Sequence, residues 1–117
     1  MFEKYEYAEI TIEELADIHP SLYRFCDVRD EVSYRYGSIP KAENISNIVE
    51  LAEEGKLDKN ISYVLYCMKG IQSMDMAYEL RGMGYDAVSL KGGYAAWLTS
   101  SYREDYEDKQ KAVETSI

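Results

Sequence analysis

Short apolar segments alternate along the chain with segments whose apolar residues recur at helical spacing. The clearest apolar segment is residues 61–66, a run rich in β-branched and aromatic side chains that predicts a buried strand. Weaker segments of the same kind predict strands at residues 22–26, 44–45 and 87–90. Strands separated by helices favour an α/β fold with a parallel sheet covered on both faces.

Capping residues predict where the helices begin and end. Thr11 is the expected N-cap of the first helix, with Glu14 completing a capping box and Ile10 packing on Leu15. This helix is expected to reach His19, whose imidazole would act as a surface cap at the end of the helix. A second helix is predicted at residues 31–36, ended by Gly37, and a third at 46–54, capped by Ser46. A fourth is predicted at residues 73–83, where Ser73 opens it and Gly84 ends it, and a fifth at 94–98, after the Gly92-Gly93 turn.

Length and charge limit the classes of function. The 117 residues predict a single domain, with a core over about residues 10–98 and a charged tail or terminal helix at 100–117. The net charge of −9 disfavours binding to nucleic acid or to an anionic membrane surface. No apolar run approaches the roughly 20 residues that span a bilayer. We therefore expect no nucleic-acid or membrane partner. Because the N-terminus lacks the pattern of a secretory signal and two cysteines form no disulfide framework, the expected compartment is the reducing cytoplasm, and the protein is expected to be a monomer.

The two cysteines, Cys26 and Cys67, are too few for a disulfide framework and lie in no metal-binding pattern, so neither a metal nor a cofactor is expected. Cys26 lies within an apolar strand and is interpreted as a packing residue. A regulatory disulfide between the two cysteines is kept as an alternative.

Cys67 follows the predicted strand 61–66 and precedes a short loop and a helix. Functional groups in α/β sheets gather at the carboxyl ends of strands. Gly70 allows the loop to curl, so that its N–H groups and the positive end of the helix dipole would stabilise a thiolate and lower its pKa. This position is equally typical of a cysteine that only fills space in the core.

Four segments, in order, decide between these interpretations, and together they resemble the rhodanese family. Residues 63–85 resemble its active-site strand, loop and helix, and Cys26-Asp27-Val28-Arg29 resembles its Asp-x-Arg strand end. Residues 37–45 resemble its Gly-His-Ile-Pro-Gly-Ala-x-Asn-Ile segment, and residues 90–97 its Gly-Gly-x-x-x-Trp ending.

The resemblance implies a rhodanese-like sheet of about five parallel strands and a sulfurtransferase. The Cys67 thiolate would take sulfane sulfur from thiosulfate or a persulfide, and would pass it from a cysteine persulfide to cyanide or to a thiol acceptor, proteins included. Asp27 and Arg29 would support the site, while Gly92, Gly93 and Trp97 would be architectural. The loop that binds the substrate would comprise Met68, Lys69, Gly70, Ile71, Gln72 and Ser73.

Four positions depart from the family pattern. Ser38 replaces the usual His and Lys41 the usual Gly, both outside the nucleophile loop. Met68 and Gln72 stand where many members carry Arg or another anion-binding residue, so thiosulfate is expected to be a poor donor and a persulfide a better one.

Two functions other than sulfur transfer are alternatives for a cysteine protein of this kind. A cysteine phosphatase or arsenate reductase needs Cys-x5-Arg, whereas the residue six after Cys67 is Ser73. A non-catalytic rhodanese-like module for protein binding or regulation is the main alternative, and the intact cysteine loop argues against it.

Overall fold

Five strands and five α-helices alternate along the part of the chain that the computed structural model describes, residues 1–101. The predicted tail lies outside these residues from position 102 onward. The strands are β1 (Glu9–Ile10), β2 (Arg24–Asp27), β3 (Glu43–Asn44), β4 (Ser62–Tyr66) and β5 (Asp86–Leu90). The helices are α1 (Ile12–Ala16), α2 (Glu31–Tyr36), α3 (Ile48–Glu53), α4 (Gln72–Gly82) and α5 (Gly93–Thr99), with a 3₁₀ turn at Pro20–Leu22.

The strands form one sheet in the order β1-β5-β4-β2-β3, and every pair of neighbours is parallel. The predicted rhodanese-like α/β fold is thus confirmed, with five strands. Strand β4 lies in the middle, between β2 and β5. Its carboxyl end therefore lies beside the carboxyl ends of both neighbours, where side chains from distant parts of the sequence meet.

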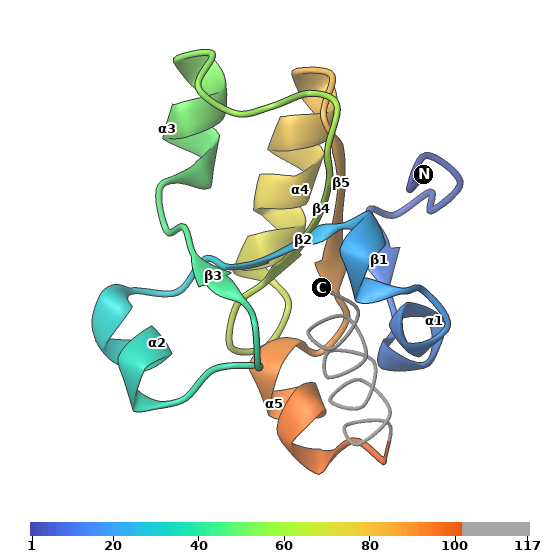
Figure 1. The fold of residues 1–117 in the computed structure, drawn as a ribbon, viewed down its shortest axis with the longest axis vertical. Coiled ribbons are helices and arrows are strands. Elements are labelled where there is room, and N and C mark those ends of the chain that lie inside the picture. The colour runs from blue at the N-terminus through green and yellow to red at the C-terminus, as the bar shows by residue number, and fades with distance from the viewer. Residues whose placement is uncertain (102–117) are drawn as a thin grey trace.

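Two hydrophobic cores lie on opposite faces of the sheet. Tyr63 and Leu65 of β4 belong to the core under α3 and α4, whereas Val64 and Tyr66 belong to the core under α1 and α5. Figure 1 shows α3 and α4 running side by side along the sheet. Because successive side chains of a strand point to opposite faces, a strand covered on both sides is apolar throughout, which is why residues 61–66 were the clearest strand signal.

The first helix begins as predicted but ends earlier. Thr11 is its N-cap, and both hydrogen bonds of the capping box with Glu14 are present, at 2.9 and 3.1 Å. The helix stops at Ala16 rather than extending to His19. His19 is a surface cap, as predicted, but not at the end of α1: its ring accepts from the backbone N–H of Ser21 and caps the start of the 3₁₀ turn that Pro20 opens.

Other boundaries differ by a residue or two. Strand β1 was not predicted, because its two residues carry too little periodicity to be recognised without the partner strand β5. Helix α3 has Asn47 rather than Ser46 as N-cap. Helix α4 begins before Ser73, which therefore lies in its first turn instead of capping it. Within residues 1–101 there is no helix with the length and apolar character needed to cross a membrane.

Candidate active site

Cys67 directly follows the last residue of β4, at the carboxyl edge of the sheet. The residue is 5% exposed, so its thiol is largely shielded from solvent while remaining at the surface of the fold. Neighbouring strand β2 ends beside it, with Asp27 in register with Tyr66. The structure thus places the predicted nucleophile where the supporting residues of β2 also end.

The loop after Cys67 folds back so that three donors converge on the sulfur. Sγ accepts hydrogen bonds from the backbone N–H of Gly70 at 3.2 Å, from the N–H of Ser73 at 3.4 Å and from the Ser73 hydroxyl at 3.3 Å. Gly70 has φ +84°, and a Cβ there would lie 2.9 Å from the nitrogen of Gly92. Only glycine fits this position without displacing the loop.

These donors determine the ionisation of the thiol. Burial raises the pKa of Cys67, but the Ser73 hydroxyl and the N–H groups of Ser73 and Gly70, which donate to the sulfur, together with the nearby N–H of Lys69 lower that pKa below the ordinary value for cysteine. A lowered pKa increases the fraction of thiolate, the nucleophilic form, at neutral pH. The loop therefore supports the chemistry of a sulfur nucleophile.

Helix α5 supports the loop from beneath. The N–H groups of Tyr94 and Ala95 donate to the carbonyls of Cys67 and Met68 at 2.9 and 3.0 Å. Gly93, with φ +60°, lies so close to the loop that a Cβ would meet the carbonyl oxygen of Cys67. Trp97, predicted as a core anchor, is buried in the core shared with α1.

Ser89 is a neighbour of the site that sequence reasoning missed. This residue of β5 is fully buried, and its Oγ lies 2.7 Å from the Oγ of Ser73. The only sequence signal was one hydroxyl inside an otherwise apolar strand, and nothing in the pattern indicated which residue it would contact.

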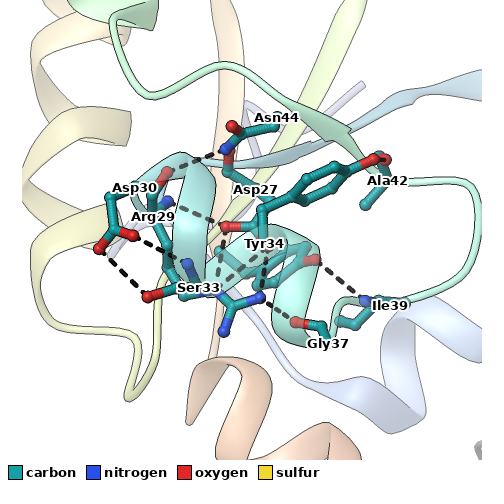
Figure 2. Close-up of polar contacts among 10 residues, drawn as sticks. Asp27, Arg29, Asp30, Ser33, Tyr34, Gly37, Ile39, Ala42 and Asn44 are labelled. Atoms are coloured by element: carbon teal, nitrogen blue, oxygen red, sulfur yellow. Dashed lines mark hydrogen bonds and ion pairs between the residues drawn. The ribbon is translucent and has the colours of Figure 1, made fainter.

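Asp27 and Arg29 form a buried ion pair at the end of β2 (Figure 2). Arg29 Nε lies 3.0 Å from Asp27 Oδ1, and Nη2 lies 2.7 Å from Oδ2. The same Nη2 donates to the carbonyl of Gly37 at 2.6 Å, which ties the strand end to the segment after α2. The Arg29 guanidinium stacks over the ring of Tyr94, 4.4 Å from its centroid. Through this contact the ion pair supports α5 and hence the loop.

The segment after α2 is held by further hydrogen bonds, most of them drawn in Figure 2. Asn44 donates from Nδ2 to the carbonyls of Asp27 and Arg29, and the hydroxyl of Tyr66 accepts from the N–H of Ile39. Lys41 has φ +68°, the left-handed region that favours glycine. A glycine would adopt this conformation more readily than the lysine does, so the lysine is a structural departure from the family pattern as well as a chemical one.

The rim of the site mixes apolar and polar side chains. Met68, Ile71 and Gln72 are exposed at the outer side of the loop, and Lys69 is exposed beside them. A cavity of about 450 Å³ adjoins Met68 and is lined by Arg29, Val32, Ser33, Tyr36, Gly37, Met68, Tyr94 and Leu98. Its one charged lining residue, Arg29, is already paired with Asp27.

Cys26 lies in β2, and both cysteines are free thiols. The residue is fully buried, and burial raises the pKa of its thiol to about 12. Such a thiol stays protonated and unreactive at neutral pH, as expected for a packing residue.

Comparisons with known proteins identify the family to which the chain belongs. The family model of the rhodanese-like domain matches residues 11–100. A protein named thiosulfate sulfurtransferase GlpE, from Pseudoalteromonas translucida, is 36% identical over 84 residues, which cover 69% of this chain and 77% of the relative.

A tRNA sulfurtransferase from Pyrobaculum aerophilum is 40% identical over 65 residues, which are 56% of this chain but only 13% of that protein. The crystal structure of a rhodanese-related protein from Thermoplasma volcanium superimposes with a TM-score of 0.68 at 29% identity, covering 80% of this chain and 93% of that one. On its sequence and on its fold, the chain belongs to the rhodanese-like domain family.

Proposed function

We propose that the chain is a sulfurtransferase that carries sulfane sulfur as a persulfide on Cys67. The Cys67 thiolate attacks the outer sulfur of the donor, the S–S bond of the donor breaks, and the rest of the donor leaves with the bonding electron pair. With thiosulfate the leaving group is sulfite; with a persulfide it is a thiolate. An acceptor thiolate then attacks the outer sulfur of the Cys67 persulfide and releases the Cys67 thiolate, so no net redox change occurs at the protein.

The observation that carries this proposal is the convergence of three hydrogen-bond donors on Cys67 Sγ, within 3.4 Å. The same thiolate is the attacking group in the first step and the leaving group in the second. A loop that stabilises this anion therefore increases the fraction of thiolate available for the first step and favours its departure in the second. A buried cysteine that only packs in a core has no need of such donors.

The rim favours a persulfide over thiosulfate as the donor. Thiosulfate carries two negative charges, whereas the loop offers one exposed cation, Lys69, beside the uncharged Met68 and Gln72, and the chain as a whole has a net charge of −9. The guanidinium of Arg29 is engaged with Asp27 and Gly37. A thiol persulfide brings less charge to the loop, and its apolar part suits the neighbouring cavity.

Intact-mass measurement tests the proposal. The protein is incubated with thiosulfate or with the persulfide of an uncharged thiol, 2-mercaptoethanol, freed of donor, and its mass is measured; a gain of one sulfur atom is expected, larger in yield with the persulfide. Cys67→Ala is the control and should gain nothing, whereas Cys26→Ala should load normally. No gain with either donor would contradict the proposal and favour a non-catalytic rhodanese-like binding module.

A further inference from the structure

Two buried hydroxyl groups form a chain that ends on the Cys67 sulfur. Ser73 Oγ lies 3.3 Å from Cys67 Sγ and 2.7 Å from Ser89 Oγ. Both serines are 0% exposed. Ser73 comes from the first turn of α4 and Ser89 from β5, where it is in register with Leu65 and lies on the same face of the sheet. The contact between the hydroxyls thus joins two elements at the site.

The number of protons in this pair of hydroxyl groups fixes which serine donates and which accepts. Each serine hydroxyl has one proton to donate, and a thiolate can only accept. When Ser73 donates to the thiolate, its proton is no longer available for Ser89. The 2.7 Å contact is then a hydrogen bond only if Ser89 donates to Ser73 Oγ.

We infer that Ser89 is a positioning residue that keeps the hydroxyl proton of Ser73 directed at the Cys67 sulfur. A hydroxyl that accepts one hydrogen bond is a stronger donor of the next, so Ser89 also strengthens the bond that Ser73 makes to the thiolate. Without Ser89, the Ser73 hydroxyl loses both its partner in β5 and the constraint on its rotation. The inference rests on the proposed role of Cys67 as a nucleophile.

The strength of the hydrogen bond from Ser73 to Cys67 depends on whether the sulfur is a thiolate or part of a persulfide. In the thiolate form the donors run from Ser89 to Ser73 to Cys67. In the persulfide form the negative charge lies on the outer sulfur, and Sγ becomes a weak acceptor. The hydroxyl chain therefore stabilises the empty enzyme more than the loaded one, and it favours the step in which the Cys67 thiolate leaves.

The charged side chains around the site do not duplicate this effect. Lys69 on the loop, Asp75 on α4 and Lys91 after β5 are exposed, where solvent screens them. Asp27 and Arg29 at the end of β2 are paired with each other. Strand β4 and helix α5 carry no charged residue. Hydrogen-bond donors are thus the principal support of the thiolate.

The rate of alkylation of Cys67 as a function of pH tests the inference. Iodoacetamide labelling is followed by mass spectrometry of the Cys67 peptide in the full-length protein, in Ser89→Ala, in Ser73→Ala and in the double variant. Ser89→Ala should raise the midpoint of the profile by about 0.5 to 1 pH unit, the size expected for one hydrogen bond. Ser73→Ala should raise it at least as much, and the double variant should match Ser73→Ala alone, because Ser89 acts through Ser73.

An unchanged midpoint in Ser89→Ala would overturn the inference, as would a double variant in which the two shifts add. Ser89→Thr keeps the hydroxyl and should retain the original midpoint, and circular dichroism checks that each variant is folded. A wild-type protein that shows these shifts but gains no sulfur would contradict the proposed function while leaving the role of Ser89 supported, so the two failures are distinguishable.

Discussion

Replacing Gly93 with alanine tests how closely α5 supports the nucleophile loop. Gly93 has φ +60°, and a Cβ built there would contact the carbonyl oxygen of Cys67, the nitrogen of Gly70 at 2.8 Å and the carbonyl carbon of Met68 at 2.8 Å. All three are backbone atoms of the strand end and the loop. They can yield only if the loop moves as a unit away from α5.

The loss of stability in Gly93→Ala has two parts, backbone strain and steric overlap, and a second glycine in the protein allows them to be measured separately. A left-handed backbone costs alanine about 1–2 kcal/mol, offset by about 0.4–1 kcal/mol because alanine restricts the unfolded chain more than glycine does. Gly55 has φ +71°, and a Cβ added there would have no atom within 4 Å, so this position should show the first part alone. Forcing a methyl group into packed surroundings adds about 1–3 kcal/mol. We therefore expect a loss of about 0–1.6 kcal/mol in Gly55→Ala and about 1–4.6 kcal/mol in Gly93→Ala.

Urea unfolding measures these free energies, and alkylation of Cys67 against pH measures the state of the loop. Moving the loop lengthens the hydrogen bonds that lower the pKa of Cys67, so Gly93→Ala should raise the midpoint whereas Gly55→Ala should not. Equal stability losses in the two variants, together with an unchanged midpoint in Gly93→Ala, would refute the role assigned to α5.

Three further predictions concern the ion pair, the thiol and a strained residue. Asp27→Asn leaves Arg29 buried without its carboxylate partner and should lower the free energy of unfolding by about 3–5 kcal/mol. The control Glu43→Gln removes the exposed ion pair with Arg24 and should cost at most about 1 kcal/mol. Similar losses for the two variants in urea unfolding would contradict this prediction. Because the pKa of Cys67 is lowered in the folded protein, alkylation of the native protein should reach its plateau at a lower pH than alkylation of the urea-unfolded protein. The thiolate's contribution to stability should be present above the pKa of the unfolded state and should be lost as the pH falls through the pKa of the folded state. A native alkylation midpoint at or above the unfolded midpoint would disprove the lowered pKa. Lys41→Gly relieves a φ of +68° and should raise the free energy of unfolding by about 0.5–1 kcal/mol, whereas a decrease in thermal stability would count against strain at this residue.

The sequence alone was sufficient for the fold and for the place of Cys67, because these depend on long-range patterns with redundant signals. Strand β4 is apolar after its first residue, Ser62, and a cysteine directly after it could lie only at the carboxyl edge. The limits of short elements were harder to predict. Helix α1 ended early because Pro20 starts a separate turn, and β1 is defined by its pairing with β5.

The residues that the sequence did not reveal act through contacts between elements. Ser89 carries no motif, and its relation to Cys67 exists only because β5 lies next to β4 and α4 packs over both. Tyr94 likewise reads as one aromatic residue among many, whereas its N–H supports the carbonyl of Cys67 and its ring lies against Arg29. Such roles depend on side-chain placement to within an ångström or so, which periodicity and spacing do not encode.

The support of the loop by α5 has a consequence for the order in which the protein matures. During synthesis, Cys67 leaves the ribosome before Ser89, Gly93 and Tyr94, which complete its surroundings. A nascent chain that ends before α5 carries the cysteine without the donors that hold its loop in place. We therefore expect the thiol to acquire its lowered pKa only once α5 has packed against the loop, as a late event of folding.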